Sequence, residues 1–336
     1  MRYWLGLMFV FTFTAEAATV VWRIQSNKLA DSIQYKLEQD FAAQVAKATN
    51  NTLVMIIKPE KKGYVGLREA YTATRLGEIQ GFFMSPQYWG GADPVLTILG
   101  DLVGAWRDPN QYLRWLRDHG GIDYLSDAYA RDGLKLVAYM VSPMESLVSR
   151  VPVGRLDDFS GQLMRTPPGM VTDYFNALGA RARELTIAQV EPALRSGQIS
   201  VADYSNVVVN EYVGLYRDNL YTNYPGFHSM PLLDFVVSQR AWSALTAPQR
   251  AALKAAAQRW QHSLDGVFRA ELKETLLRLQ QQGVKLQRWS PQELKKARNL
   301  AVKIWDRYAK KSEHASLLLT QLKRWLAKEG NITASR

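Results

Sequence analysis

Arg165 has the sequence surroundings that best suit ligand chemistry in this chain. Residues 162–165 have the composition of a short strand, and Pro167 and Pro168 follow directly. Each proline fixes φ and lacks a backbone donor, so the strand must end there, and a helix can begin near Pro168. A guanidinium offers a planar pair of donors that suits a carboxylate at any physiological pH. We therefore predict that Arg165 lies at a strand–helix junction and binds the carboxylate of a small organic acid.

A structural role for Arg165 is the alternative. An ion pair with Asp157, Asp158 or Asp173, all close in the sequence, would use the same guanidinium. Spacing alone does not separate the two hypotheses, because structural ion pairs and binding sites employ the same residue types.

Three further candidates lie in predicted connections between elements. Tyr88 and Trp89 lie in a Gly/Pro-rich loop directly after a predicted strand, where side chains of an α/β protein face the ligand crevice. Ordinary aromatic packing would place them equally well. Glu145 lies in residues 142–153, which are predicted to form an extended crossover into a second lobe.

The elements that must position these residues follow a strand–helix alternation. Strands are predicted at residues 19–24, 53–58, 79–84 and 134–141 in a first lobe, and at 162–165, 183–185 and 200–204 in a second. Helical spacing separates most of them, and this order favours parallel pairing and the α/β class. Asp31 is the expected cap of the first helix.

Later segments return to the first lobe. Residues 232–237 are predicted to form a buried strand, and residues 247–282 a single helix of ~54 Å that crosses both lobes. The expected organisation is therefore discontinuous: 18–142 with about 232–265 in lobe I, and 143–231 with about 266–328 in lobe II. The tail 329–336 is expected to fray.

Composition excludes several functions. The 336 residues carry a net charge of +11, but Lys and Arg are spread along amphipathic helices with acids between them. Without a dense basic block or zinc-finger spacing, we expect a solvated basic surface and no nucleic-acid partner. The absence of cysteine excludes disulfides, thiolate metal sites, cysteine nucleophiles and lipoprotein attachment.

The N-terminus has the pattern of a secretory signal. Arg2 precedes an apolar run over residues 3–13, and Ala15-Glu16-Ala17 has the form of a cleavage site. A signal peptide at 1–17 predicts a soluble periplasmic protein that begins near Ala18. A buried first helix is the alternative interpretation.

Longer motifs resemble a known family. The segments GEIQGFF before YWGGADP, DDFSGQLMRTPPGM, ALGARARELTIAQVEPALRSGQISVADYS and YPGFHSMP are similar to the DctP-type extracytoplasmic solute receptors of TRAP transporters, and the similarity extends to about residue 328. The resemblance implies a two-lobed, type II-like periplasmic binding fold with hinge strands. It implies a receptor that delivers one solute to a sodium-coupled membrane permease.

The resemblance also bears on individual residues. Arg165 matches the arginine that binds the solute carboxylate in the family. Many relatives have a second arginine or a glutamine near the position of Glu145, and a glutamate there would repel a second carboxylate. This favours a monocarboxylate with a polar or aromatic body, such as a uronate, aldonate, hydroxy acid or aromatic acid.

Other positions receive weaker support from the resemblance. In the branch that binds 2-oxoacids through a metal, a glutamate stands where Ser229 stands here, so we expect no metal and no cofactor. His228 could donate to solute oxygens or be a structural histidine. Asn206 and Asn210 could reach the pocket, or they could cap a helix or lie on its exposed face. Tyr204 and Phe227 could line the pocket or pack in the core.

An enzyme is the alternative from another class. The chain has no GxSxG, HExxH, Walker A or GxGxxG motif, so the expectation is binding without catalysis. The competing hypothesis is an α/β enzyme acting on organic acids, with Glu145 or His228 as general base and Arg165 as the substrate clamp.

Overall fold

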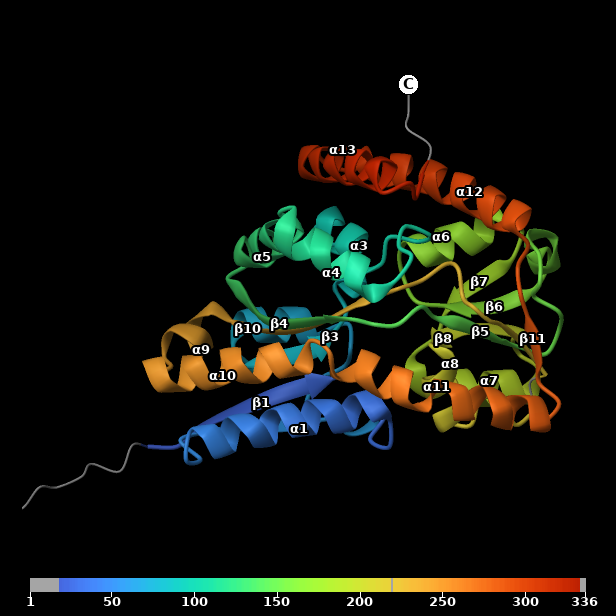
Figure 1. Ribbon diagram of the computed structural model, residues 1–336. Helices are drawn as coiled ribbons and strands as arrows, with labels where there is room; N and C mark the ends of the chain where they lie inside the picture. The colour runs from blue at the N-terminus through green and yellow to red at the C-terminus, as the bar shows by residue number, and fades with distance from the viewer. Residues whose placement is uncertain (1–17, 219, 333–336) are drawn as a thin grey trace, which may run out of the picture.

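The predicted strands assemble into two separate mixed sheets, each with its own helices (Figure 1). The computed structural model describes residues 18–218 and 220–332, so the predicted signal peptide lies outside the described residues. We call the half built on the first sheet lobe I and the half built on the second sheet lobe II. This two-lobed α/β architecture is the predicted one.

The sheet of lobe I combines N-terminal strands with one returning strand. Its order is β2-β1-β3-β10-β4, with β1 parallel to β2 and β3, and β10 antiparallel to β3 and β4. The strands are β1 (Val20–Ser26), β2 (Leu53–Lys58), β3 (Gly81–Met84), β4 (Leu134–Val141) and β10 (Leu232–Ser238). Parallel β1 and β3 therefore end at the same edge, which faces lobe II.

Helices cover both faces of this sheet. Figure 1 shows α1 and α10 on one face and α3, α4 and α5 on the other. Lobe I contains α1 (Ile33–Ala48), α2 (Ala70–Leu76), α3 (Pro94–Gly100), α4 (Pro109–Asp118), α5 (Gly121–Ala130), α9 (Gln239–Ser243) and short 3₁₀ turns at Glu60–Lys62 and Pro86–Trp89. Helix α3, whose N-cap is Asp93, was not predicted from the sequence.

The sheet of lobe II has the order β11-β9-β5-β8-β6-β7. Its strands are β5 (Ser146–Ser149), β6 (Leu163–Thr166), β7 (Arg181–Glu184), β8 (Val201–Ser205), β9 (Tyr221–Asn223) and β11 (Lys285–Gln287), and its helices are α6 (Met170–Ala177), α7 (Ile187–Ser196) and α8 (Val207–Tyr212). A 3₁₀ turn at Leu156–Phe159 precedes β6. Thr186 forms the predicted cap of α7, as part of a capping box.

The prediction that residues 142–153 form an extended crossover without a packed element was wrong. Its middle is β5, a buried strand that pairs antiparallel with β8 and β9. Only four residues long, β5 has no periodicity that sequence could detect, and its pairing depends on distant partners. One is the side-chain oxygen of Asn223, which accepts from the Leu147 N–H at 2.6 Å.

The predicted single helix over 247–282 is also corrected. It is divided into α10 (Ala247–Trp260) and α11 (Ser263–Gln281). α10 packs on α1 and β4 of lobe I, whereas α11 packs on α8 and β11 of lobe II. Trp260, at the end of α10, lies edge-to-face against Phe41 and Phe83. α11 also contacts α1 of lobe I. The residues between the two helices, Gln261 and His262, are not helix breakers, so the division reflects tertiary packing.

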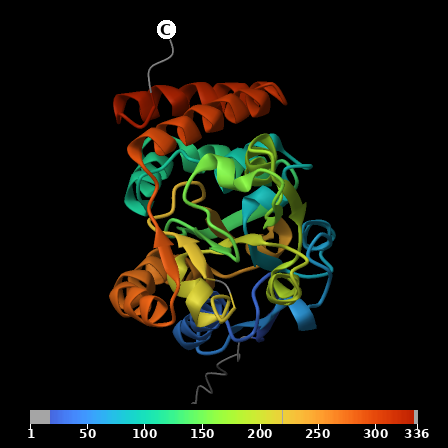
Figure 2. The ribbon, with the colours of Figure 1, turned by 90° about the vertical axis from the view of Figure 1, so that its right-hand side faces the viewer.

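A C-terminal helix pair lies across the top of both lobes (Figures 1 and 2). α12 (Pro291–Ala309) contacts α6 and α3, and α13 (Glu313–Lys328) contacts α3. The start of the predicted frayed tail is anchored, because Asn331 is buried and its amide donates to the Ala105 carbonyl at 2.6 Å. Among the described residues, no helix combines the length and apolar character needed to cross a bilayer.

Candidate functional site

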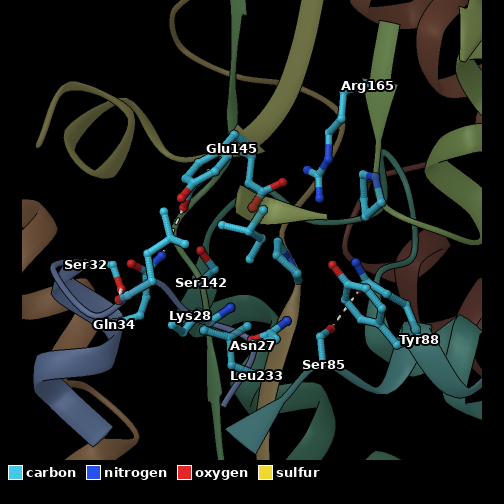
Figure 3. A pocket seen from close by; sticks show the side chains of 17 residues that line it. Asn27, Lys28, Ser32, Gln34, Ser85, Tyr88, Ser142, Glu145, Arg165 and Leu233 are labelled. Atoms are coloured by element: carbon cyan, nitrogen blue, oxygen red, sulfur yellow. Dashed lines mark hydrogen bonds between the residues drawn. The ribbon is translucent and has the colours of Figure 1, made fainter. Parts of the chain in front are cut away.

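A polar cavity lies between the lobes, at the edge where β1, β3 and β6 end (Figure 3). Its volume is about 50 Å³, enough for a few waters or a compact solute, since one water requires ~10–15 Å³ of such space. It is lined by Asn27, Lys28, Leu29, Ser32, Gln34, Ser85, Gln87, Tyr88, Ser142, Glu145, Arg165, Pro167, Ile187, Tyr204, Ser205, Pro231 and Leu233. The position fits the rule that open α/β sheets bind ligands beyond their strand ends.

Arg165 lies on β6 and reaches the cavity from lobe II. It is 3% exposed, and its Nε donates to the Leu185 carbonyl at 3.1 Å while Nη1 donates to the Asp203 carbonyl. Both acceptors are neutral backbone oxygens. They fix the plane of the guanidinium, and the end of the side chain points into the cavity (Figure 3).

The ion pairs that were the structural alternative for Arg165 do not form, because Asp157, Asp158 and Asp173 have other partners. Asp157 pairs with Arg155 at 3.1 Å, and Asp158 accepts from the Gly154 N–H at 2.8 Å. Asp173 accepts from the Tyr308 hydroxyl at 3.0 Å. Within residues 18–218 and 220–332, no carboxylate oxygen lies within 4.0 Å of the Arg165 guanidinium.

The loop after β6 brings the lobes together. The strand ends at Thr166 and α6 begins at Met170, slightly later than predicted. Gly169, its N-cap, has φ 97°, and a Cβ there would lie 2.9 Å from the Thr97 side chain of α3. Glycine is therefore required both by the backbone conformation and by the approach of lobe I.

The residues that line the cavity from lobe I were not predicted from the sequence. Asn27 and Lys28 follow β1 directly, and Ser32 and Gln34 belong to the start of α1. The available signal was their position after the end of a parallel strand, the same rule that was applied to Tyr88. The predicted cap Asp31 was wrong: Ser32 is the N-cap, and its Oγ accepts from the backbone N–H three residues on at 3.2 Å.

Tyr88 lines the cavity, whereas Trp89 is core. Tyr88 belongs to the 3₁₀ turn after β3, and burial raises the pKa of its hydroxyl, which therefore remains a hydrogen-bond donor at neutral pH. Trp89 is buried and packs against the rings of Tyr71 and Phe82. The prediction of a cavity position therefore holds for Tyr88, and the alternative of aromatic packing holds for Trp89.

Glu145 lies in the connection between β4 and β5 and belongs to a buried hydrogen-bonded cluster. The Ser229 hydroxyl lies 2.9 Å from Glu145 Oε2 and also contacts Asp101 Oδ2. A serine hydroxyl has one proton to donate, so one of the two carboxyls must itself donate to Ser229. Asp101 also accepts from the Met230 N–H at 3.2 Å, which favours Glu145 as the protonated member.

The electrostatics of the cluster agree with this assignment. Burial, followed by the nearby Asp203 and Asp101, raises the pKa of Glu145 well above its usual range. Burial raises the pKa of Asp101 to about 7, although the Ser229 hydrogen bond opposes the shift. Two carboxylates this close in a dry site cannot both be ionised without a large cost.

His228 lies behind the cavity and does not line it. Its Nε2 is 3.1 Å from Asp203 Oδ1, and both side chains are fully buried. Burial alone would raise the pKa of Asp203, but the His228 charge and hydrogen bond lower it below its usual value. The structure thus brings His228 to an acid and not to the cavity.

The same cluster has the donor set of a cation site. Glu145, Asp203 and His228 each offer a ligand atom, and these atoms lie within 4.8 Å of one another. Carboxylate oxygens and an imidazole nitrogen suit several divalent cations. The expectation of no metal therefore stays a prediction, and the buried pair of Asp203 and His228 is where a cation would compete with a proton.

Of the remaining predicted residues, one lines the cavity and three support the surrounding structure. Tyr204 lines the cavity beside Arg165. Asn206 caps α8, accepting at 3.1 Å from the Val208 and Val209 N–H groups, while Asn210 donates to the Ser146 and Ser205 carbonyls. Phe227 stacks on Trp289 with ring centroids 3.9 Å apart. These three scaffold residues do not line the cavity.

Comparison with known proteins places this geometry in context. The family model described as bacterial extracellular solute-binding protein, family 7, matches residues 25–312. A curated relative from Nostoc sp., described as a monocarboxylate 2-oxoacid-binding periplasmic protein, is 25% identical over 87% of this chain and 80% of its own length.

Solved structures of TRAP periplasmic solute-binding proteins share the fold. An apo open structure from Rhodobacter sphaeroides is 29% identical, with a TM-score of 0.74 over 94% of this chain and 100% of that chain. A structure from Bordetella bronchiseptica with calcium and picolinate in its active site is 20% identical, with a TM-score of 0.83 over 93% of each chain.

Proposed function

Because the chain belongs to the bacterial extracellular solute-binding proteins of family 7, we propose that it is a periplasmic receptor for a small organic acid. The solute binds between the lobes with one carboxylate on Arg165. The loaded receptor then delivers it to a TRAP-type, sodium-coupled permease. The permease, a separate membrane protein, carries out the transport itself.

The observation that carries this proposal is the state of Arg165. It is a buried, permanently charged side chain without an acidic partner among the described residues, and it faces a polar cavity. A buried unpaired charge is costly, whereas an arginine paired bidentately with a carboxylate is stable. A solute carboxylate supplies the missing partner and is held in the plane fixed by the two backbone carbonyls.

The relatives support a small acid without naming it. The Nostoc protein is described as binding monocarboxylate 2-oxoacids, and the Bordetella structure contains picolinate. Another relative, from Bordetella pertussis, binds pyroglutamic acid. Each of these solutes is a small acid with a single carboxylate, as a carboxylate on Arg165 requires.

The test is a thermal-shift screen of the protein with organic acids. The acids are 2-oxoacids, hydroxy acids, uronates, aldonates and aromatic carboxylates, each with and without added calcium. A solute at 100 times its Kd should add ~2.7 kcal/mol to the free energy of unfolding. We expect a shift with one class of acid in the wild type and none in Arg165→Gln.

A matched control comes from the neighbouring strand. Arg183 is paired with Arg165 in the register of β6 and β7 but is exposed. Arg183→Gln should retain the shift. Loss of the shift in both variants, or its retention in Arg165→Gln, would reject Arg165 as the carboxylate-binding residue.

Catalysis is tested with the same acids. We expect each bound acid to be recovered unchanged after prolonged incubation, as judged by mass spectrometry. Chemical conversion of the acid, lost on replacing Glu145 or His228, would instead support the enzyme hypothesis.

A further inference from the structure

Another cavity lies between the lobes and shares no lining residue with the polar cavity that Arg165 faces. Its volume is about 160 Å³. Trp106 and Arg107, in the connection between α3 and α4, line it from lobe I, and Tyr174 of α6 lines it from lobe II. Helix α12, which lies over α6 in Figure 1, contributes Arg298. We call this space the second cavity.

The two segments that connect the lobes, residues 142–145 and 226–231, line both cavities with different residues. Glu145 lines the polar cavity, whereas Met144 and Phe227 line the second cavity. A ligand in the second cavity would therefore contact both lobes and both connecting segments without entering the polar cavity.

Three aromatic rings form much of the wall of the second cavity, and each is held by its own neighbours. Trp106 stacks on Tyr112 with ring centroids 4.1 Å apart, and Phe227 stacks on Trp289. The Tyr174 hydroxyl donates to a backbone carbonyl of α12 at 3.3 Å. A cavity of about 150 Å³ with apolar walls can hold one benzene molecule, so the second cavity has room for a single aromatic ring.

Arg298 brings a positive charge to this apolar space. It is half-buried, and its Nη1 donates to the Asn331 carbonyl at 2.7 Å. Within residues 18–218 and 220–332, no carboxylate oxygen lies within 4.0 Å of its guanidinium. Arg298 also lines a wider surface groove that adjoins the second cavity and contains Lys295 and Lys303. The entrance to the second cavity is therefore basic.

Arg107 adds a second guanidinium, and its acidic partner is shared. Arg107 Nη2 lies 3.4 Å from Glu329 Oε2, and the same oxygen lies 3.2 Å from Arg114 Nη2. Burial, followed by the charge of Arg107, lowers the pKa of Arg298. The charges of Arg107 and Arg298 thus disfavour each other, and an anion bound between them would stabilise both.

We propose that the second cavity binds an aromatic acid with one ring and one anionic group, of the class of benzoate or benzenesulfonate. The ring lies against Trp106, Tyr174 and Phe227. The anionic group accepts charge-assisted hydrogen bonds from Arg107 and Arg298. This site goes beyond the proposed function, which concerns the polar cavity alone.

The experiment is a ligand-observed NMR titration with benzoate and benzenesulfonate. Benzyl alcohol has the ring without the charge and acetate has the charge without the ring, so they are the matched compounds. The proteins are the wild type, Arg165→Gln, and Arg165→Gln combined with Arg298→Gln, Arg107→Gln or Arg307→Gln. Arg307 is exposed on the same helix as Arg298 and lines neither cavity, which makes it the matched control.

We expect Arg165→Gln to bind at least one of the two aromatic acids about tenfold more tightly than benzyl alcohol or acetate. Adding Arg298→Gln or Arg107→Gln should weaken this binding about tenfold, because the glutamine side chain has no charge. Adding Arg307→Gln should leave it unchanged. Arg107 is exposed, so its variant should fold even if Arg298→Gln does not, and thermal denaturation checks each protein.

Three outcomes would overturn the inference. Binding to the wild type that is lost in Arg165→Gln would assign the aromatic acid to the polar cavity, which would support the proposed function instead. Unchanged affinity on adding Arg298→Gln and Arg107→Gln, or equal affinity for benzoate, benzenesulfonate and benzyl alcohol, would show that these arginines bind no anion. Absence of binding to every protein would reject the second site, whereas the proposed function fails only if the thermal-shift screen fails.

Discussion

At the scale of single residues, the behaviour of Arg165 follows from its two backbone acceptors. Leu185 and Asp203 provide the carbonyls that orient the guanidinium, and the remaining N–H groups are left for a ligand. An orientation fixed before binding reduces the entropy lost when the solute arrives. This division of donors is available to arginine and not to lysine.

Arg165→Lys should therefore weaken solute binding by more than tenfold. A lysine ammonium cannot contact both carbonyls and still present two parallel donors to a carboxylate. Isothermal titration with the solute identified by the thermal screen measures the effect, and Arg183→Lys on the neighbouring strand is the control. Unchanged affinity in Arg165→Lys would show that the bidentate geometry is not used.

Asp234 gives a prediction about stability and pH. It is fully buried on β10, and burial raises its pKa to about 7 although the Tyr129 hydroxyl donates to it at 2.5 Å. Because the pKa in the folded state is raised from 3.8, the stabilising contribution is complete below pH 3.8 and is lost as the pH rises through about 7.

Asp234→Asn should remove this loss, since an amide does not ionise and still accepts from Tyr129. Between pH 4 and 7 the unfolding free energy of the variant should fall less steeply than that of the wild type, by about 1.4 kcal/mol per pH unit. Urea denaturation at several pH values tests this. The exposed Asp157→Asn should keep the wild-type slope, and an equal slope in Asp234→Asn would show that Asp234 is ionised throughout.

At the scale of elements, the two segments that connect the lobes, residues 142–145 and 226–231, are packed too closely to accept an added methyl group. The two segments run side by side: the Glu145 N–H donates to the Ser229 carbonyl at 2.9 Å, and the Ser142 N–H to the Pro231 carbonyl at 2.9 Å. A Cβ on Gly226 would lie 1.8 Å from the Glu145 carbonyl oxygen. The Glu145 carbonyl belongs to the backbone, so it cannot move away from the added methyl group as the end of a flexible side chain could.

Gly226→Ala should consequently destabilise the protein and weaken solute binding together, because it separates the segment that carries Ser229 from Glu145.

Gly266→Ala is the opposite case, since Gly266 lies inside α11 and a Cβ there meets nothing within 4 Å. That variant should gain about 0.5–1 kcal/mol of stability. Chemical denaturation and titration of both variants measure this, and a stable Gly226→Ala with normal affinity would contradict the packing argument.

At the scale of the whole molecule, two polar contacts join side chains of the two lobes. Gln34 of lobe I donates to Ser205 of lobe II at 3.4 Å, and Arg68 pairs with Glu184 at 3.5 Å. The second pair is exposed and so contributes little stability. We expect these two contacts to break in an open form of the protein and bound solute to favour the closed form.

Spin labels at Arg68→Cys and Glu184→Cys should report this directly, because the chain has no cysteine of its own. We expect solute to shift the label-to-label distances towards the short end of the distribution, as measured by pulsed electron resonance. The same labels on a background of Arg165→Gln should show no shift. A distribution that solute leaves unchanged in the labelled protein would indicate a site that does not close on its ligand.

The sequence by itself determined the local features of the protein. The bounds of β2 and β4 were predicted, because both segments are rich in apolar residues and are bounded by turn or helix signals. Arg165 was placed at the end of a strand by the two prolines that follow it. These features depend on residues that are neighbours in the chain, and so their signal is local.

Only the tertiary structure decided what depends on distant partners. β5 is a strand because β8 and β9 flank it, and the helix over 247–282 divides because each lobe holds its own part. Lys28, Ser229 and Asp101 meet the cavity or its cluster from segments far apart in the sequence. The net charge around the cavity depends on residues from all of these segments. No single stretch of sequence can therefore predict it.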